Sequence, residues 1–515
     1  MIKKLALLLV LVLLLVAAEA SADSQRLTFL HVNDVYEIMP RDGIGGLAEL
    51  QTLVRKERSA ATHSLFTFGG DLLSPSLLSG LTRGAHLIEF MNLLGVDVAV
   101  PGNHEFDFGP DNFIQRRRES RFPWLINNMI DAEGKPYGGM INSWIYRLPP
   151  ATPATPDPAN QFGEIKIGFL GLITPDTATS SKPGPSVTFQ PVIETAQAAA
   201  AALQAAGADM VVALTHLPVA EDRQLATAVP AIDLILGGHD HDPMAVYEGP
   251  TLIVKAGSDA FYLAAIEIGI ERTLANNGRK RITIHNQGLR LITTRGVIPD
   301  PEAANLAQRQ QAQLNADMSK PLATLTIDLD SRREGVRSRE SSMADVIADA
   351  MRAATEAEVA LINGGGVRGN RLHQSGTPIT VADILSELPF GDVTLLMELK
   401  GTDLLATLEN GLGKVESGSG RFLQVSGLRM VWDGTKPPGQ RVIELSIGGK
   451  PLEPERVYRV AVFDYLYSGS DGFDSLRHGK LLIDASAATL TATQTIEYLS
   501  RHGAGLTVGD RIIRR

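Results

Sequence analysis

The sequence predicts an α/β protein made of two domains, and three observations support that fold class. A chain of 515 residues is longer than one compact domain usually is. From about residue 24 to residue 300, short apolar runs alternate with helical patterns, as is typical of a layered domain with a largely buried sheet. After a polar segment at 302–317 the pattern restarts, which indicates a second domain of about 190 residues.

The expected elements of the first domain are short strands that alternate with longer helices. We expect strands at 27–32, 65–68, 96–100, 165–170, 210–214 and 233–236, and helices at 44–55, 85–94 and 193–206. One stretch interrupts this alternation, because Leu148–Asn160 contains five prolines and reads as a surface loop.

The second domain is expected to begin after a connecting helix. Residues 302–317 are rich in polar side chains, and we expect them to form a solvent-exposed helix that also serves as the hinge. An apolar run at 322–329 follows. Ser342, with Asp345 three residues later, predicts a variant capping box that opens a helix over 343–354.

The N-terminus has the features of a secretory signal peptide. Lys3 and Lys4 precede an apolar run at 5–18, and small residues follow at 20–22. The run is too short for a good membrane span, and an N-terminal anchor that is never cleaved is the alternative. We therefore expect cleavage after Ala22 and a secreted protein, in a bacterial periplasm or outside the cell, without stable membrane insertion.

The composition excludes several classes of function. With 44% hydrophobic and 21% charged residues, the chain does not resemble a mostly disordered protein. A net charge of -10, from 48 Lys and Arg against 58 Asp and Glu, provides no basic footprint for a nucleic-acid polymer. The absence of cysteine excludes disulfides, thiolate catalysis and iron–sulfur clusters.

Metal-ligand side chains follow five of the expected strands. Ligands bind at the carboxyl ends of the strands in open α/β sheets, so we expect these side chains to converge. They occur in Asn33-Asp34, Gly69–Asp71, Gly102–Glu105, Thr215-His216 and Gly237–His241. Imidazole, carboxylate and amide ligands suit divalent first-row metals, and Asp71 could bridge two ions that clamp a phosphoryl group and generate a hydroxide.

Each of these segments alone would be an ordinary turn or loop, and only their combination indicates a site. The other histidines lack such a context, and we expect them to be structural or solvated. They are His31, His63, His86, His285, His373, His478 and His502.

The second domain carries a pattern suited to an anionic, planar ligand. A glycine-rich turn with an arginine, Asn363–Arg368, follows the apolar run at 359–362, and an arginine fork can bind phosphate. Phe390 and Tyr465 lie on expected turns, where two aromatic rings could stack on a base. Each aromatic residue alone would more commonly be part of the core.

Taken together, these motifs resemble the calcineurin-like metallophosphoesterases, specifically the two-domain 5'-nucleotidase/UDP-sugar hydrolase family. The resemblance covers nearly all of the mature chain, and the family run G-N-H-E-F-D is complete at Gly102–Asp107. It implies a four-layer α/β/β/α domain at 23–300, a helical linker at 301–320 and a smaller α+β nucleotide-binding domain at 321–515.

The resemblance also implies roles for individual residues. Two divalent ions (Mn, Zn, Co or Fe) would be bound, the first by Asp34, Asp71 and His241 and the second by Asp71, Asn103, His216 and His239. His104, paired with Asp107, would stabilise the transition state or protonate the leaving oxygen. The substrate-binding residues would be Arg333, Arg337, Asn363, Arg368, Phe390, Tyr465 and Asp471, the last of these on the ribose. The two domains would rotate between open and closed positions.

One departure from the family concerns the first metal, because the usual histidine of N-D-x-H is Tyr36 in this chain. In the first reading Tyr36 does not bind metal, which leaves the first site with an open position and weaker affinity. It could instead bind as a phenolate, which favours ferric iron and a coloured centre. In a third reading His31 takes its place, although residues 31 and 34 point to opposite sides of an extended chain. Smaller departures are Ser470 in G-G-D-G and Ala344-Asp345 in place of Gly-Asn.

These features predict a secreted dinuclear-metal phosphohydrolase that releases phosphate from 5'-nucleotides by attack of a metal-bound hydroxide. UDP-sugars or nucleoside diphosphates are further expected substrates, and we expect a monomer. The alternatives are a broad-specificity phosphomonoesterase with a tyrosinate-bound metal and a 2',3'-cyclic nucleotide phosphodiesterase. A nucleotide-binding protein without activity is the third.

Overall fold

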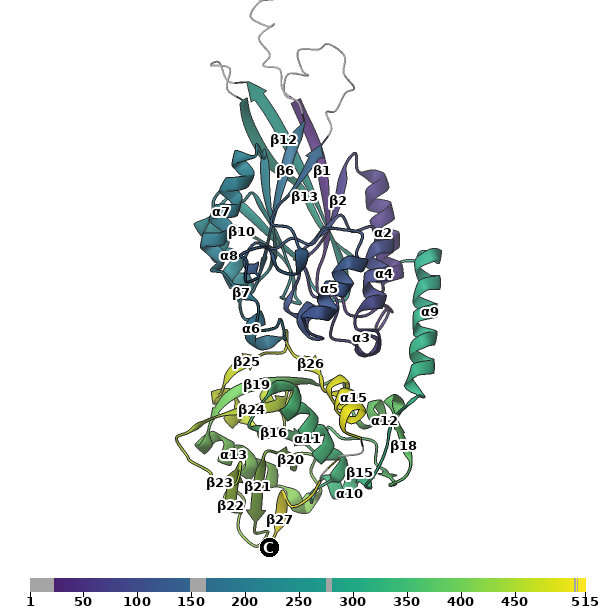
Figure 1. The fold of residues 1–515 in the computed structure, drawn as a ribbon, viewed down its shortest axis with the longest axis vertical. Coiled ribbons are helices and arrows are strands. Elements are labelled where there is room, and N and C mark those ends of the chain that lie inside the picture. Colours follow the sequence, from purple (N-terminus) through teal and green to yellow (C-terminus); the bar gives the residue numbers. More distant parts are fainter. Residues whose placement is uncertain (1–22, 149–163, 275–279, 504–505, 507) are drawn as a thin grey trace, which may run out of the picture.

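The computed structural model describes residues 23–148, 164–274, 280–503, 506 and 508–515, which form two bodies joined by a long helix (Figure 1). The first body precedes the helix α9 (Pro301–Met318), and the second begins with β14 (Pro321–Thr324). The expected signal peptide at 1–22 lies outside the described residues. So does the proline-rich stretch, except for Leu148 at the buried end of β5 (Trp144–Leu148).

Two sheets form the centre of the first body. Their strand orders are β13–β12–β1–β2–β3 and β10–β11–β9–β8–β6–β5. The other strand bounds are β1 (Asp23–Val32), β2 (Ser64–Phe68), β3 (Val98–Ala99), β6 (Ile165–Ile173), β8 (Met210–His216), β9 (Leu234–Gly237), β10 (Pro243–Glu248), β11 (Thr251–Ala256), β12 (Tyr262–Leu274) and β13 (Lys280–Thr293), with a separate pair of β4 (Met129–Ile130) and β7 (Thr188–Phe189).

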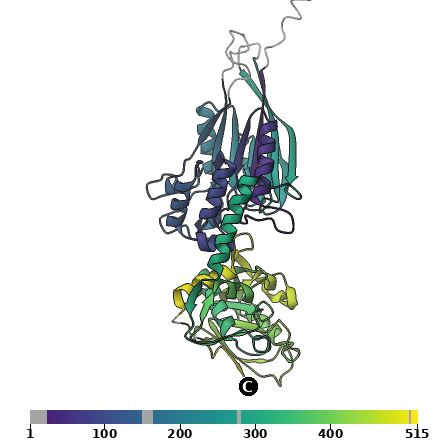
Figure 2. The same cartoon turned by 90° about the vertical axis from the view of Figure 1, so that its right-hand side faces the viewer.

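Alternating side chains of β1 explain how the layers stack. Leu27 and Phe29 belong to the apolar core between the two sheets, whereas Leu30 and Val32 belong to the core under the helices. The first sheet is covered by α2 (Leu47–Ala60), α4 (Ala85–Leu94) and α5 (Pro110–Glu119), and the second by α7 (Val192–Ala205) and α8 (Val219–Ala228) (Figures 1 and 2). The expected α/β/β/α architecture is therefore confirmed.

The structure corrects two expected boundaries in this body. The helix expected at 44–55 begins only at Leu47 and ends at Ala60. Gly45 and Gly46 have φ angles of 86° and 89°, which a right-handed helix cannot contain. The strand expected at 96–100 pairs only over Val98–Ala99.

The connecting helix is not the solvent-exposed helix that its polar composition suggested. Ala303, Leu306, Ala307 and Leu314 are buried in the core of the first body, and α9 packs on α2 and α4. Asp300 caps the helix by accepting hydrogen bonds from the backbone N–H groups of residues 302 and 303. The linker helix is therefore attached to the first body along one face.

The second body is built on a mixed sheet with the order β20–β16–β24–β19–β25 and a smaller sheet, β23–β22–β21–β27. Its strands are β15 (Leu329–Asp330), β16 (Val359–Asn363), β17 (Leu372–His373), β18 (Pro378–Thr380), β19 (Val393–Lys400), β20 (Leu423–Ser426), β21 (Leu428–Trp432), β22 (Val442–Ile447), β23 (Lys450–Pro451), β24 (Val457–Phe463), β25 (Lys480–Ile483), β26 (Thr489–Leu490) and β27 (Ile512–Arg514). The run expected at 322–329 is divided between β14 and β15.

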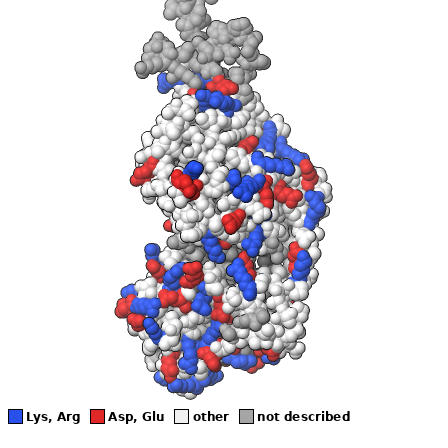
Figure 3. Space-filling view, in the orientation of Figure 1, with Lys and Arg blue, Asp and Glu red and all other residues white. Residues whose placement is uncertain are grey.

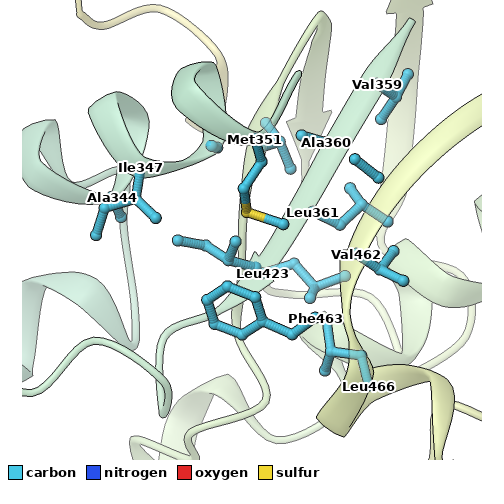
Figure 4. Packing of buried hydrophobic residues seen from close by; sticks show 14 of the residues in the cluster. Ala344, Ile347, Met351, Val359, Ala360, Leu361, Leu423, Val462, Phe463 and Leu466 are labelled. Atoms are coloured by element: carbon cyan, nitrogen blue, oxygen red, sulfur yellow. The ribbon is translucent and has the colours of Figure 1, made fainter. Parts of the chain in front are cut away.

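Helices pack on the larger sheet of the second body, and together they enclose its core. In Figure 4, Met351 of α11 (Ser342–Thr355) lies against Leu361 of β16, with Val462 and Phe463 of β24 beside them. The remaining helices are α10 (Arg333–Val336), α12 (Val381–Glu387), α13 (Gly401–Leu412), α14 (Asp464–Tyr467) and α15 (Thr491–His502). This is the expected α+β domain.

The capping box expected at Ser342 is wrong by one residue. Ser341 is the N-cap, and its hydroxyl accepts from the N–H of Ala344. Ser342 instead donates to the carbonyl of Asp328, and the buried Asp345 points to the C-terminal segment, where it accepts from Gly509 N. Across the described part of the chain, the helices lack the length and apolar character needed to cross a bilayer.

Candidate functional site

The ends of β1 and β2 bring two buried aspartates together. The loops after these parallel strands continue to pair, because Asp34 N donates to Gly70 O and Val35 N donates to Asp71 O. Both aspartates adopt positive φ angles, 53° for Asp34 and 63° for Asp71. A positive φ is uncommon for residues other than glycine, and aspartate tolerates it better than most.

The second sheet contributes histidines to the same point. His216, the last residue of β8, donates from Nδ1 to Gly69 O and places Nε2 3.1 Å from Asp71 Oδ2. His239 follows β9, and its backbone N–H donates to Asp34 Oδ2 at 2.9 Å. Donor atoms of Asp34, Asp71 and His216 all lie within 4.8 Å of one another.

Two residues next to this cluster carry buried polar atoms without a partner in the described part of the chain: Asn103, which precedes His104, and His239, whose ring centroid is 5.2 Å from that of His216. Both amide atoms of Asn103 and Nδ1 of His239 are buried without a hydrogen-bond partner among the described residues. Such atoms are costly to bury unless something binds them. Together with two carboxylates and His216 they form an N/O donor set that suits a divalent first-row metal. The residues present therefore fit the metals that this fold implies.

The hydroxyl of Tyr36 lies among the residues expected to hold the first metal. It is 3.1 Å from Asp34 Oδ1, 3.3 Å from Asp71 Oδ2 and 3.1 Å from His241 Nε2. His241 Nε2 is itself 3.3 Å from Asp34 Oδ1. Donor atoms around one ion with bonds of about 2.1 Å are separated by about 3.0–3.4 Å. The phenol oxygen thus has the spacing of a fourth ligand.

His31 does not take the place of Tyr36. Its Nδ1 bonds with the hydroxyl of Thr67 at 2.9 Å, and its Nε2 bonds with the carbonyl of Gly237 at 3.0 Å. Burial lowers the pKa of His31 to about 4, so the ring is neutral at physiological pH. The ring joins the two sheets, as a structural histidine would.

His104 and Asp107 form a buried pair at the edge of the cluster. His104 Nδ1 lies 2.7 Å from Asp107 Oδ2, and Ser181 donates to the other carboxylate oxygen at 2.8 Å. Burial alone would lower the pKa of His104, but the charges of Asp107 and Asp71 outweigh it and raise the pKa to about 10. The other ring nitrogen donates to Ser486 O of the second body at 2.9 Å.

Glu105 organises the loop that carries Asn103 and His104. Its carboxylate accepts hydrogen bonds from the backbone N–H groups of Asp71 and Leu72, and from that of Gly102 at 2.5 Å. Burial raises its pKa to about 8. The sequence motif contained Glu105, but only the structure assigns it this positioning role.

Lys255 is a second residue that the sequence did not single out. It is fully buried in β11, and its ammonium donates to the carbonyls of Leu217 and Gly238 at 2.5 and 2.7 Å. It also forms ion pairs with Asp222 at 2.9 Å and Asp240 at 2.5 Å. Because Leu217 follows His216 and residues 238 and 240 flank His239, Lys255 ties the two histidine loops together.

A second site lies at one edge of the larger sheet in the second body. The parallel strands β16 and β24 both end at this edge. β16 ends with Asn363, and β24 is followed by the segment that contains Tyr465. The antiparallel strand β19 begins at the same edge, shortly after Phe390. Ten residues line one pocket at this edge: Arg337, Asn363, Gly365, Gly366, Arg368, Phe390, Asp392, Gly420, Tyr465 and Asp471. Nearly all the substrate-binding residues expected from the sequence are thus brought together.

Within this pocket, both aromatic side chains are accessible. Phe390 is 55% exposed and Tyr465 is 42% exposed, so a ligand in the pocket can reach both rings. Arg368 places its guanidinium 4.9 Å from the Phe390 ring centroid. Arg333 does not line the pocket, but its charge acts on neighbouring Arg337. Asp392 and Gly420 were not expected from the sequence.

The two sites do not share a cavity in this arrangement of the bodies. Helix α14 lies between them, because Tyr465 lines the pocket just described while Asp464 and Tyr467 line a cleft with His239, His241 and Ser486. On the face seen in Figure 3, acidic and basic side chains are interspersed over the second body and form no continuous basic band.

Comparison with known proteins identifies both bodies. Residues 27–243 match the calcineurin-like phosphoesterase family, and residues 321–478 match the C-terminal domain of 5'-nucleotidases. A Bacillus subtilis trifunctional nucleotide phosphoesterase protein is 29% identical over 495 residues, which is 88% of this chain but only 33% of that protein. A Bos taurus 5'-nucleotidase is 26% identical over 89% of this chain and 86% of its own.

Solved structures agree with this result. A 5'-nucleotidase precursor from Thermus thermophilus is 29% identical, with a TM-score of 0.53 over 95% of this chain and 99% of its own. The Haemophilus influenzae NAD nucleotidase shares the fold, with a TM-score of 0.78 at 20% identity over 96% of this chain and all of its own. The chain therefore belongs to the two-domain 5'-nucleotidase family of metallophosphoesterases, which are hydrolases acting on nucleotide phosphoesters.

Proposed function

We propose that this protein is a secreted phosphohydrolase that uses two divalent metals to release phosphate from 5'-nucleotides. One observation carries the proposal: a buried cluster of metal-type donors in one body accompanies an aromatic, arginine-lined pocket in the other. Nucleoside diphosphates and UDP-sugars are further candidate substrates, because aromatic side chains for a base and arginines for a phosphate would suit nucleotides with either one or two phosphates.

The metals would be bound by residues from both sheets of the first domain. Asp34, Asp71, His241 and Tyr36 would hold one ion, and Asp71, Asn103, His216 and His239 would hold the other. When bound, such ions supply Lewis-acid charge for the phosphoryl oxygens and an activated water as nucleophile. Lys255 and Glu105 would keep the ligand loops in place before the metals arrive.

His104 would act on the substrate through Nε2. Asp107 accepts from Nδ1, which fixes the ring orientation and favours the protonated form. In that form Nε2 can donate to a phosphoryl oxygen that gains charge, or pass its proton to the leaving 5'-oxygen. Ser486 occupies this donor in the present arrangement, so the second domain has to move before His104 can contact a substrate.

The C-terminal domain would bind the rest of the nucleotide. Phe390 and Tyr465 would stack on the base, and Arg337 and Arg368 would neutralise the phosphate. Asn363 would add an amide contact, Asp471 would accept from the ribose hydroxyls, and Arg333 would add charge from outside the pocket wall.

Catalysis would then require rotation of the C-terminal domain toward the metals. Because α9 packs on the first body, the hinge is better placed between Met318 and Pro321 than within the helix. The proposed mature chain comprises a metallophosphoesterase domain at 23–300, a linker at 301–320 and a nucleotide-binding domain at 321–515, with residues 1–22 removed on export.

A substrate panel tests the proposal. Metal-free protein should be inert toward AMP, and Mn, Co, Zn or Fe should restore phosphate release. Equal turnover of simple phosphate esters would favour the broad-specificity alternative, and a preference for 2',3'-cyclic nucleotides would favour the phosphodiesterase. Absence of turnover with every metal would leave a binding protein.

A variant pair tests the role of His104. His104→Ala should reduce kcat by about 10²–10⁴-fold with much less effect on substrate binding. His285→Ala, at a histidine whose side chain is 47% exposed on β13, is the matched control and should keep wild-type kinetics. An equal loss in kcat and in binding would mean that His104 does not act in the transition state.

A further inference from the structure

One carboxylate in the nucleotide pocket has no role in the function proposed above. Asp392 lines the pocket two residues after Phe390, just before β19 begins. Its side chain has neither a hydrogen bond nor an ion pair with any residue that the structure describes, and it is half-buried. Burial, followed by the nearby charge of Asp464, raises the pKa of Asp392 to about 6, so the group is mainly ionised at neutral pH.

The arrangement of charges shows which part of a nucleotide can lie next to Asp392. The charged neighbours of Arg337 are Arg333, Arg368 and Asp471, so the cations gather around one part of the pocket. The charged neighbour of Asp392 is another carboxylate, that of Asp464. A phosphate would be repelled by this acidic pair and attracted to the arginines. The uncharged base and ribose are the parts of the ligand that can approach Asp392. Because the ribose is assigned to Asp471, which lies near Arg337, the base is the part left for Asp392.

Backbone pairing also brings Asp392 close to the stacking residues. β19 pairs with β24 with Thr394 opposite Phe463, so the segment before β19 meets the segment after β24. Asp464 Oδ1 accepts from Val393 N at 3.3 Å, which joins the residues that follow Asp392 to the residue that precedes Tyr465. The segment that carries Phe390 and Asp392 therefore runs beside the segment that leads to Tyr465, and all three residues line the same pocket.

An ionised carboxylate can only accept hydrogen bonds, and it is best satisfied by two parallel N–H donors. Guanine offers this pair on one edge, in its N1–H and its 2-amino group. Adenine and cytosine present an amino group next to an acceptor nitrogen, and uracil presents one N–H between two carbonyls. Hypoxanthine has the same N1–H as guanine but lacks the amino group.

We propose that Asp392 recognises guanine through N1–H and the 2-amino group, so that guanosine 5'-phosphates are the preferred substrates. The inference rests on the proposed nucleotidase function and specifies its substrate. Asp392 is here a specificity residue: it touches the base and takes no part in phosphoryl transfer. A base that leaves this carboxylate unpaired is rejected more strongly than its area of contact would suggest.

The test compares GMP, IMP and AMP by kcat/KM with the metal-loaded enzyme. The comparison of GMP with IMP is the sharpest, because the two differ at the amino group that Asp392 would bind. We expect GMP to exceed IMP by about tenfold or more, and AMP by at least as much. Equal values for GMP and IMP would overturn the proposal.

Substitution at this position should change the preference in a defined direction. In Asp392→Asn the amide offers one donor and one acceptor, which match N1 and the 6-amino group of adenine. The ratio of GMP to AMP should therefore fall at least tenfold, while Asp392→Ala should lose discrimination without gaining AMP. Asp433→Asn, at a partly exposed carboxylate on the same domain that does not line the pocket, is the control and should keep the wild-type ratios. An unchanged GMP/IMP ratio in Asp392→Asn would also overturn the proposal.

Failure of this inference can be told apart from failure of the proposed function. Phosphate release from all three nucleotides at equal efficiency would remove the role of Asp392 and leave the nucleotidase function intact. Absence of release from every nucleotide, with any of the metals, would remove the function itself.

Discussion

Tyr36 offers the most direct test of the metal site, because its hydroxyl lies among the residues expected to hold the first metal. Its hydroxyl is within 3.3 Å of Asp34, Asp71 and His241 and is buried, with 7% of the residue exposed. If the oxygen is a metal ligand, Tyr36→Phe removes a ligand. If it is only a hydrogen-bond donor, the same substitution removes one bond to buried carboxylates.

The two cases differ in magnitude. Without Tyr36, Asp34 Oδ2 still accepts from Asn33 and His239, and Asp71 Oδ1 still accepts from His104 N. The metal-free protein should therefore lose only about 1.5–3 kcal/mol of unfolding free energy, as for one hydrogen bond to a charged group. As a ligand, Tyr36 should contribute more to metal binding than an outer-shell partner, so affinity for the first ion should fall by at least about 10–100-fold.

Titration calorimetry of metal-free protein measures this affinity, and absorption spectroscopy identifies the ligand. Iron-loaded wild-type protein should show a visible phenolate-to-iron charge-transfer band that is absent in Tyr36→Phe. Tyr36→His should bind the metal tightly but without colour. Tyr137→Phe, which removes another buried hydroxyl of this domain, should change neither property. A colourless but active iron form, or unchanged affinity in Tyr36→Phe, would refute ligation.

Two further predictions concern Lys255 and Asp345, which are both buried ionisable groups. Lys255→Met should lower the unfolding free energy by about 3–5 kcal/mol, because it leaves Asp222 and Asp240 near the metal loops without their cation. Urea denaturation measures this loss, and adding Asp222→Asn to the same variant should recover part of it. A loss below about 1 kcal/mol would contradict the role of Lys255. Burial, partly offset by Arg511, raises the pKa of Asp345 to about 8. The folded state therefore keeps a proton that the unfolded chain releases near pH 4, so this group's contribution to stability decreases as the pH rises from about 4 to about 8. Asp345→Asn should reduce that decrease, and an equally steep pH dependence of unfolding in the variant would contradict the assignment.

The convergence of the metal-type side chains could be predicted because it follows from a general property of parallel strands. Asp34, Asp71 and His216 follow strands whose carboxyl ends meet, and the glycines beside them permit the sharp turns. A Cβ atom at Gly70 would lie 2.7 Å from the ring of His216, so this glycine is required by the approach of the two sheets. The positions of these residues along the sequence were therefore sufficient to predict that they form one site.

Lys255, Asp392 and Ser486 could not be predicted in this way. Lys255 is a single lysine in an apolar strand, and its partners come from α8 and from the loop after β9. The roles of Asp392 and Ser486 depend on which strand or domain packs opposite them. The local hydrophobic pattern of the sequence does not contain this information. The inward face of α9 was different, because Ala303, Leu306, Ala307 and Leu314 already have helical spacing. The apolar spacing of these four residues predicts a buried face, but the polar composition of the whole segment obscured it.

A cross-link between the two domains would test whether the observed arrangement can catalyse. Gly80 of α3 (Leu77–Thr82) lies against Thr493 of α15, and a Cβ atom at Gly80 would be 4.0 Å from the Thr493 Cβ. That separation falls within the range of about 3.5–4.5 Å for a disulfide. Because the chain has no cysteine, Gly80→Cys with Thr493→Cys would form one defined bond.

If catalysis requires domain rotation, the oxidised double variant should still bind nucleotide but lose turnover. In this arrangement the carbonyl of Ser486 accepts a hydrogen bond from Nε2 of His104. The nucleotide pocket and the cleft lined by His239 and His241 are two separate cavities. Since a misplacement of about 1 Å can cost a hundredfold in rate, we expect a loss of at least that size, reversed by reduction. The single variants, treated with the same oxidant, should keep full activity. An oxidised double variant as active as its reduced form would show that the observed arrangement is itself competent, so that substrate reaches the metals without rotation.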